Sequence, residues 1–264
     1  MVAAVALAGA LALGAGGSPR PSLPPTARFD VVVVDAGHGG EDRGARGFAG
    51  LLEKNVALDV AVRLAHRLKA EGLRVVMTRS GDRFVSLAER TQIANRARAD
   101  LFISIHANAS HYHKARGIET FFASPEATDD AAHELAAAEN LAFGEAAGRP
   151  ASGDPLLAIL GDMIVTEHLE DSQEFARIAQ ARIAKTGAAR SRGVKQAPFV
   201  VLMGVDMPSV LVELGFLTNA KDEKTLRSNR ERDRLAEGLA EAVDIFRERQ
   251  DARQEPRVTG GEAG

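Results

Sequence analysis

Cysteine is missing from all 264 residues of this chain. Its absence excludes disulfide frameworks, thiolate nucleophiles, thiolate metal sites and lipids attached through cysteine. Any metal must therefore be bound by histidine and carboxylate side chains. An excess of positive charge is missing as well, because the formal net charge is −3 at pH 7. Nucleic acid and anionic lipid are therefore not expected as the main partners.

Charged residues are also absent from the N-terminal stretch. Residues 2–17 form an uncharged run of Ala, Leu, Val and Gly, which is too short to span a membrane and has the length of the apolar part of a signal segment. Signal segments normally begin with positive charge, whereas the first arginine here is Arg20. We expect residues 1–17 to direct export to the periplasm or cell wall, with cleavage or an upstream start left open. A flexible Ala-rich tail is the alternative.

Composition divides the remaining chain into a linker, a domain and a tail. With 45% hydrophobic and 26% charged residues, the chain can bury a core without disulfides or metals. The Pro-rich residues 18–28 are expected to form a linker, and the Gly- and Glu-rich residues 250–264 a disordered tail. We expect residues 29–249 to form one domain. No large exposed apolar stripe is evident, which favours a monomer.

Strand-like and helix-like segments alternate along this domain. Parallel strands need crossover connections that are usually helical, so the alternation predicts a three-layer α/β fold with a mixed, mostly parallel sheet of about six strands flanked by helices. A helical insertion is expected at about 124–190, because this region contains only helix-like segments. The expected strands are 29–35, 73–78, 101–106, 117–123, 198–203 and 208–214, and the expected helices include 54–70, 87–98 and a closing helix around 235–246.

Two histidines follow predicted strands at the ends where ligands usually bind. His38 lies in DAGHGG directly after the first strand, and His106 ends the third strand. The carboxyl ends of strands in an open α/β sheet can face one site. Glu53 begins the first predicted helix, where the helix dipole keeps its carboxylate ionised. Two imidazoles and one carboxylate suit one tetrahedral zinc ion with an open position for water, so we predict a catalytic zinc site.

A further carboxylate, Glu213, ends the last predicted strand in PSVLVELGF. Beside a water activated by zinc, Glu213 would act as a general base that takes a proton as the water attacks a carbonyl and returns it to the leaving amine. This arrangement predicts hydrolysis of an amide. Each residue alone also has a structural explanation, such as a hydrogen-bonded histidine or a charge at a helix start, so the prediction depends on their convergence.

A series of motifs resembles the zinc-dependent N-acetylmuramoyl-L-alanine amidases of the bacterial cell wall, the amidase type 3 family. The motifs occur in order over residues 31–219 and include VVVVDAGHGGEDRGARG, LLEKNVALDVA, MTRSGD, LAERTQIAN, ADLFISIHANA and PSVLVELGFLTN. The resemblance implies that His38, Glu53 and His106 bind zinc. It also implies that Glu213 is the catalytic carboxylate and that the substrate is peptidoglycan, cut between the lactyl group of muramic acid and L-alanine.

The expected insertion resembles the regulatory segment of cell-division amidases, in which a helix covers the zinc until an activator protein withdraws it. Leu156–Ala179 matches that segment in type. On this interpretation Glu167 or Glu170 reaches the open metal position as a temporary ligand, with His168 as a third candidate. A helix that shapes the substrate groove without blocking it is the alternative.

Three classes of function remain open on the sequence alone. The first is the amidase, and the second is another zinc amide hydrolase, such as a peptidase or a sugar deacetylase. The third is a non-catalytic wall-binding module, which is disfavoured because degenerate members are expected to lose a ligand or the base. Asp35, at the end of the first strand, is considered either as a hydrogen-bond partner of a ligand histidine or as a strand-end cap.

Overall fold

In this computed structural model, the described residues are 28–142 and 155–254, and the side chains of Ala142 and of residues 155–167 are not among those described. The expected signal segment therefore lies outside the described residues, together with nearly all of the expected linker and most of the expected tail. Within the described ranges, no helix is long and apolar enough to cross a membrane.

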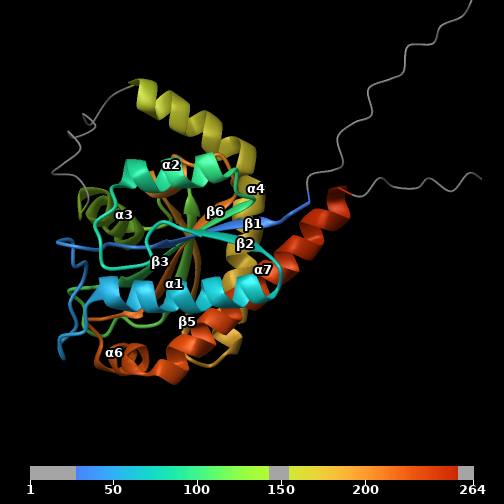
Figure 1. The fold of residues 1–264 in the computed structure, drawn as a ribbon. Helices are drawn as coiled ribbons and strands as arrows, with labels where there is room; N and C mark the ends of the chain where they lie inside the picture. The colour runs from blue at the N-terminus through green and yellow to red at the C-terminus, as the bar shows by residue number, and fades with distance from the viewer. Residues whose placement is uncertain (1–27, 143–154, 255–264) are drawn as a thin grey trace, which may run out of the picture.

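A mixed six-stranded sheet forms the centre of the molecule (Figure 1). The strand order is β2-β1-β3-β6-β4-β5. Strands β1, β2, β3 and β6 run parallel, whereas β4 is antiparallel to β6 and parallel to β5. The expected mixed, mostly parallel sheet is thereby confirmed. The strand bounds are β1 Val31–Ala36, β2 Arg74–Met77, β3 Leu101–Asn108, β4 Ile118–Ala123, β5 Ser191–Ala197 and β6 Ser209–Phe216.

Helices cover both faces of this sheet, which gives the three layers expected from the sequence (Figure 1). Residues of β1 alternate between two hydrophobic clusters, as the period of two in a strand requires: Val32 and Val34 belong to one cluster, and Val31 and Val33 to the other. The first cluster is covered by α1 (Glu53–Ala70), α4 (Pro155–Lys185) and α7 (Asn229–Gln254), with α6 (Ala220–Arg227) beside α7. The second is covered by α2 (Leu87–Ala97), α3 (Asp130–Ala142) and α5 (Val200–Met203).

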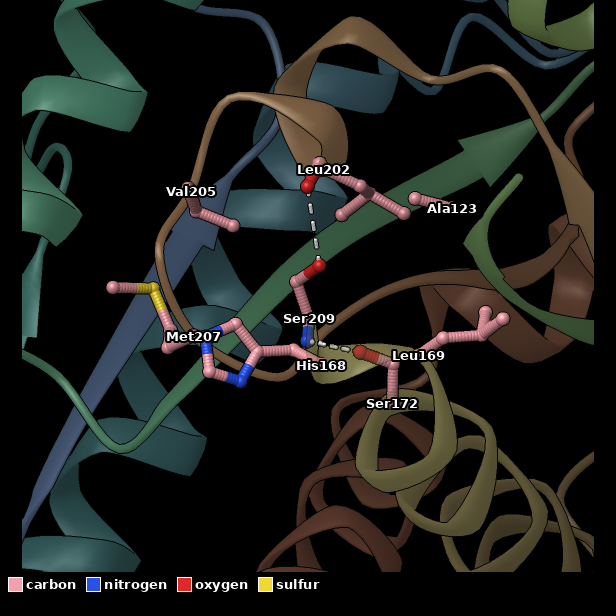
Figure 2. Close-up of a pocket in the computed structure, with 8 residues that line it drawn as sticks. All are labelled: Ala123, His168, Leu169, Ser172, Leu202, Val205, Met207 and Ser209. Atoms are coloured by element: carbon pink, nitrogen blue, oxygen red, sulfur yellow. Dashed lines mark hydrogen bonds between the residues drawn. The ribbon is translucent and has the colours of Figure 1, made fainter. Parts of the chain in front are cut away.

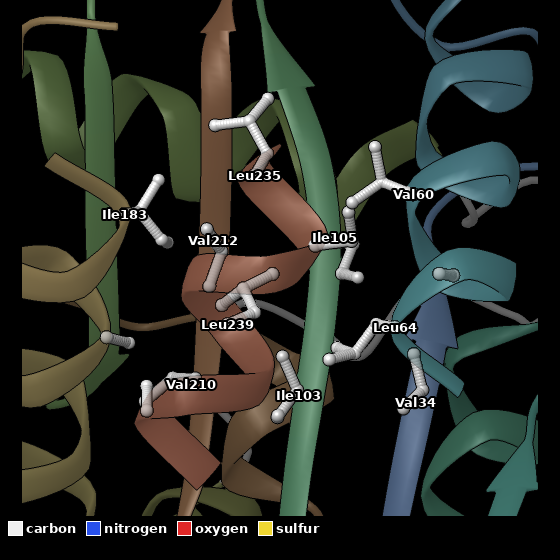
Figure 3. Packing of buried hydrophobic residues seen from close by; sticks show 14 of the residues in the cluster. Val34, Val60, Leu64, Ile103, Ile105, Ile183, Val210, Val212, Leu235 and Leu239 are labelled. Carbon is white, nitrogen blue, oxygen red and sulfur yellow. The ribbon is translucent and has the colours of Figure 1, made fainter. Parts of the chain in front are cut away.

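The first cluster shows why α1 and α7 are amphipathic. Figure 3 shows Val60 and Leu64 of α1 and Leu235 and Leu239 of α7 directed at apolar side chains of the sheet. All four are fully buried. Truncating such a side chain to alanine typically destabilises a protein by about 2–5 kcal/mol. The apolar residues whose spacing predicted the helices therefore also hold them against the sheet.

The fifth strand differs from the prediction. The expected strand 198–203 is instead a short helix, α5, and the edge strand β5 precedes it at Ser191–Ala197. An edge strand needs no continuous apolar run, and β5 is mostly half-buried or exposed. Phe199, Val201 and Leu202 bury their side chains against the second cluster as a helical turn. A short apolar run cannot by itself distinguish a strand from a buried helical turn.

Two helices, α3 and α4, lie between β4 and β5, as expected for a helical insertion. They cover opposite faces of the sheet. The described part of α4 buries Phe175, Ala179 and Ile183 in the first cluster, at spacings that place them on one side of a helix. In contrast, α3 buries Ala132 and Ala136 in the second cluster. This separation determines which of the two helices reaches the functional site.

Candidate metal centre

The loop after β1 holds His38 in a conformation that two buried arginines support. His38 has a φ of 58°, in the left-handed region that is unfavourable for residues other than glycine. Arg90 donates hydrogen bonds to the carbonyls of Ala36 and His38 at 2.7 and 2.9 Å. Arg79 donates to the carbonyls of Ala36 and Gly37 at 2.9 and 2.7 Å. These bonds fix the backbone and thereby position the imidazole of His38.

Four side chains from different elements converge at the carboxyl end of β1 and β3. They are His38 in the loop after β1, Glu53 at the start of α1, His106 in β3, and Glu139 in α3, and each offers a ligand atom within 4.8 Å of the others. Glu53 Oε1 lies 3.0 Å from both His38 Nε2 and His106 Nδ1. Glu139 Oε2 lies 3.4 and 3.2 Å from the same two nitrogens. The fold therefore brings the three predicted ligands together and adds a fourth group.

The spacing of these atoms fits a tetrahedral zinc ion. Ligand atoms about 2.0–2.2 Å from a tetrahedral zinc lie roughly 3.3–3.6 Å from one another. The four separations run from 3.0 to 3.4 Å, so one lies in this range and three are slightly shorter. Imidazole nitrogen and carboxylate oxygen are donors that zinc accepts, and no thiolate is needed. The residues present are thus able to hold zinc.

The carboxylate that orients His38 is Asp42, and not Asp35 as considered from the sequence. Asp42 Oδ2 lies 2.9 Å from His38 Nδ1, and Oδ1 accepts a hydrogen bond from the Gly44 amide at 3.0 Å. Burial raises the pKa of Asp42, but its hydrogen bond with His38 and the charge of His38 outweigh this effect and lower it. A carboxylate at Nδ1 directs Nε2 to a metal. Asp35 is paired with Arg90 instead.

Two glycines allow the backbone to approach the ligands. A Cβ atom at Gly37 would lie 2.5 Å from His106 Nε2, and one at Gly44 would lie 2.5 Å from Glu53 Oε2. Gly44 also has a φ of +60°, which side chains rarely tolerate. Both positions therefore require glycine for steric reasons, which accounts for part of the glycine-rich motif.

The concentration of charge shifts pKa values in both directions. Burial alone would lower the pKa of His38, but the charge of Glu53 and the hydrogen bond to Asp42 raise it to about 10. Burial also opposes the shift of His106, whose pKa is raised well above its usual range by Glu139 and Glu53. For Glu53 burial acts to raise the pKa, and His38 and His106 lower it. Both imidazoles therefore hold protons that a metal would replace.

Glu213 lies between the metal ligands and a second buried glutamate. In the register of the sheet, Glu213 lies opposite His106 of β3 on one side and opposite Glu119 of β4 on the other. Neither carboxylate oxygen has a hydrogen-bond partner among the described residues. Burial raises the pKa of Glu213 well above its usual range; the charge of His106 opposes this shift, and Glu53 and Glu139 add to it. A buried carboxylate without partners is unfavourable for stability, and such groups concentrate at functional sites.

Sequence reasoning missed Glu139, the fourth group of the centre. The expected residues were Glu167 or Glu170 on α4, but Glu170 is exposed on α4, outside the cluster. The side chain of Glu167 lies outside the described residues. The sequence of α3, DAAHELAAAENLA, consists largely of alanine and offers little contrast between an apolar and a polar side. Nothing in that pattern distinguishes Glu139 from a surface charge.

His168, the third candidate, lies at the opposite end of β6. It lines a small pocket with Met207 and Ser209, where the Ser209 amide donates a hydrogen bond to Ser172 Oγ at 3.0 Å (Figure 2). Ser209 precedes Glu213 by four residues, which corresponds to about 13 Å along a strand. His168 therefore takes part in the packing of α4 against the start of β6, and not in the metal centre.

The comparisons with known proteins agree with one another. The family model described as N-acetylmuramoyl-L-alanine amidase matches residues 32–244. AmiA of Escherichia coli, an N-acetylmuramoyl-L-alanine amidase, is 38% identical over 230 residues, which cover 86% of this chain and 79% of AmiA. AmiC of Neisseria meningitidis is 36% identical over 231 residues, which cover 87% of this chain but 55% of AmiC, so the chain spans about half the length of that relative. The crystal structure of an N-acetylmuramoyl-L-alanine amidase from Clostridium difficile 630 matches with a TM-score of 0.63 and 28% identity, covering 83% of this chain and 97% of that chain.

Proposed function

Because this chain belongs to the N-acetylmuramoyl-L-alanine amidase family, we propose that it hydrolyses the amide bond between N-acetylmuramic acid and L-alanine in peptidoglycan. The observation that supports this most directly is the meeting of His38, Glu53 and His106 beside Glu213. A peptidase or a sugar deacetylase would use the same centre, so family membership selects the bond. A wall-binding module has no use for a buried Glu213 that lacks a hydrogen-bond partner among the described residues.

The proposed mechanism assigns a separate role to each residue. His38 Nε2, His106 Nδ1 and Glu53 would hold one zinc ion. When bound, zinc lowers the pKa of water to roughly 7 and polarises a carbonyl group. Glu213 accepts a proton on its carboxylate as water attacks the amide carbon, and then returns the proton to the leaving nitrogen of L-alanine. Both oxygens of Glu213 are available for this transfer because neither has a hydrogen-bond partner among the described residues.

Release of stem peptides from purified peptidoglycan tests this proposal. The intact chain, the zinc-stripped chain and the Glu213→Gln variant are compared, each with and without Glu139→Gln, and the product termini are identified by mass spectrometry. We expect new L-alanine amino termini that disappear on zinc removal and decrease about 10²- to 10⁴-fold in Glu213→Gln. Termini inside the peptide or free acetate would identify a peptidase or a deacetylase. If no zinc-loaded form releases any product, the chain is not a peptidoglycan hydrolase.

We further propose that Glu139 keeps the enzyme inactive while α3 covers the centre. Its Oε2 atom lies within 3.4 Å of the two histidine nitrogens, so it would bind zinc in place of the water that a catalytic site needs. The end of α3 is anchored by Asn140, which donates to the Pro198 carbonyl at 2.8 Å and accepts from the Val200 amide at 2.9 Å. An activator protein that detaches α3 would remove Glu139 from the centre. In the alternative, α3 only shapes the groove.

Two substitutions in the intact chain separate these interpretations. Glu139→Gln removes the charged blocking group, and Asn140→Ala removes two hydrogen bonds of about 1 kcal/mol each, so both should increase peptide release without an activator. For Asn140→Ala we expect an increase of about 5- to 30-fold. His133→Ala, on the exposed side of α3, is the matched control and should leave the rate unchanged. If both test variants bind zinc but release no more peptide than the control, α3 is a groove-shaping helix.

We also propose that the chain is exported and acts as a monomer. Its proposed substrate, peptidoglycan, lies outside the cytoplasmic membrane, and residues 1–17 remain the candidate signal. Fractionation of cells that express the chain would test export, and light scattering of the purified chain would test the monomer. Cytoplasmic retention or a stable dimer would contradict the respective part.

A further inference from the structure

A cavity of about 310 Å³ lies between α3 and the sheet, next to the metal centre. Asn108 lines it, two residues after the ligand His106 in β3. Two cationic side chains of β5, Arg192 and Lys195, line another part. Phe121, Phe216 and several alanines of α3 supply apolar parts of the lining, and residues of the loop after β3 line a further part. The cavity therefore combines apolar walls with two cations and two carboxylates, Glu119 and Glu134.

This cavity continues from the metal centre on one face of the sheet. His106, Glu213 and Glu119 are paired residue by residue across β3, β6 and β4, and the side chains of directly paired residues point to the same face. Lys195 of β5 is paired with Phe121, two residues after Glu119 in β4, and thus lies on that face as well. A substrate bound at the zinc ligands could extend across β6 and β4 to Lys195.

Two cations share one buried carboxylate in this cavity. Glu119 Oε1 lies 2.9 Å from Arg192 Nε and 2.8 Å from Lys195 Nζ. The Arg192 guanidinium is further held over the Phe216 ring, 5.1 Å from its centroid. Burial alone would lower the pKa of Lys195, but its hydrogen bonds to Glu119 and Asp129 outweigh this effect and raise it. Lys195 is therefore charged at neutral pH, and the single carboxylate of Glu119 balances only one of the two cations.

The remaining negative charge comes from the helix that covers the site. Lys195 Nζ lies 3.0 Å from Asp129 Oδ2, and Asp129 Oδ1 caps the start of α3 by accepting from the Ala132 amide at 2.8 Å. Glu134, the other carboxylate that lines the cavity beside Glu119, also belongs to α3. Withdrawal of α3 would therefore leave the two cations facing Glu119 alone, with an excess of positive charge.

We propose that Arg192 and Lys195 form a binding site for a carboxylate in the peptide part of the substrate, and that Asp129 occupies this site while α3 is in place. The inference rests on the proposed function. Asp129 and Glu139 are ten residues apart in sequence, which corresponds to about 15 Å along a helix. Through these two side chains α3 presents one carboxylate to the metal ligands and another to the cationic pair. An acidic peptide would present its scissile carbonyl and a more distant carboxylate to the same two places.

Two substitutions that break the same ion pair should have opposite effects on binding. Lys195→Met removes the site, whereas Asp129→Asn removes its internal competitor. Both are made in the zinc-loaded, full-length chain carrying Glu139→Gln and Glu213→Gln, which opens the centre and prevents turnover. The probes are an N-acetylmuramoyl tripeptide with free carboxylates and the same peptide with its carboxylates amidated, and affinity is measured by calorimetry.

We expect the parent chain to bind the free acid about tenfold more tightly than the amidated peptide, because charge-assisted hydrogen bonds are stronger than neutral ones. Lys195→Met should abolish this preference, and Lys195→Arg, which retains the charge, should preserve it. Asp129→Asn should increase the affinity for the free acid several-fold and leave that for the amidated peptide unchanged. Peptides amidated at one carboxylate at a time then identify which carboxylate is bound.

Other outcomes would overturn the inference. If Lys195→Met weakens both peptides equally, or if Asp129→Asn weakens the free acid, these residues only hold α3 in place. Absence of any preference for the free acid in the parent chain leads to the same conclusion. Failure of the proposed function gives a different result: the carboxylate preference depends on Lys195, yet the Glu139→Gln chain hydrolyses neither peptide.

Discussion

Two clusters of buried charge lie at the same end of the sheet, one around Asp35 and one around Glu213 beside His106. They differ in the hydrogen-bond partners of their carboxylates. In the first, Asp35 accepts hydrogen bonds from Thr78 Oγ1 at 2.6 Å and from Ser104 Oγ at 2.7 Å. Its ion pair with Arg90 completes the set at 2.5 Å. In the second, Glu213 has no hydrogen-bond partner among the described residues for either oxygen. We expect the first cluster to stabilise the fold and the second to reduce stability, because Glu213, the proposed general base, is buried without such bonds.

In the sequence the two carboxylates look alike. Asp35 ends the apolar run FDVVVVD, and Glu213 ends the apolar run PSVLVE. Both are fully buried in the structure. Burial and charge therefore do not distinguish the two carboxylates, whereas their hydrogen-bond partners among the described residues do. The four predictions below test this difference, from the largest expected effect to the smallest.

Asp35→Asn should lower the free energy of unfolding by about 3–5 kcal/mol, because it leaves Arg90 buried without its counter-charge. Urea denaturation measures this loss. Glu89→Gln is the control, since Glu89 pairs with Arg83 at the surface, and exposed ion pairs contribute little. If the two variants lose similar amounts of stability, the Asp35 cluster is not a structural support.

The same cluster predicts a pH dependence. Burial raises the pKa of Asp35, but Arg90 and the hydrogen bonds outweigh burial, so its pKa in the folded state is lowered. A lowered pKa means that this stabilisation is complete above the unfolded value of about 3.9 and is lost as the pH falls through the folded value. The acid-induced loss of stability should therefore be smaller in Asp35→Asn than in the parent chain.

Zinc binding should release protons from the imidazoles of His38 and His106, which lie beside Glu213. Both ligand imidazoles have raised pKa values, that of His38 being about 10, so they are protonated at neutral pH when no metal is bound. We expect about two protons to be released per zinc ion, and the apparent affinity to rise up to about a hundredfold per pH unit below the pKa of His38. Calorimetry in buffers of different ionisation enthalpy counts these protons. Release of less than one proton would show that the carboxylates do not hold the imidazoles in the charged form.

Glu213→Met should increase the free energy of unfolding by about 1–3 kcal/mol while it abolishes peptide release, because it replaces an unsatisfied buried carboxylate with an apolar side chain of similar size. Glu119→Met is the matched control on the adjacent strand. It removes the partner of Arg192 and Lys195 and should reduce stability. A loss of stability of equal size in both variants would show that Glu213 has partners in solution and that the two clusters do not differ.

The sequence by itself determined the elements that local pattern controls. The β-branched run of β1, the glycines after it and the amphipathic spacing of α1 and α7 predicted the sheet, a sharp loop and the helices that cover one face. His38 follows β1, Glu53 begins α1 and His106 lies near the end of β3, so their convergence followed from the rule that parallel strands end at one edge. The prediction of β5 was wrong because an edge strand needs no apolar run and α5 carries one.

Only the tertiary structure decided which distant residues meet. Glu139 reaches the metal ligands because α3 covers the same face of the sheet as His106, whereas the described part of α4 packs on the opposite face. Likewise, Asp42 rather than Asp35 orients His38. Periodicity and composition report how each segment is buried relative to its own neighbours, but they do not specify which face of the sheet a helix covers. That choice depends on strand order and on the packing of the whole core, and it determines the groups around the candidate metal centre.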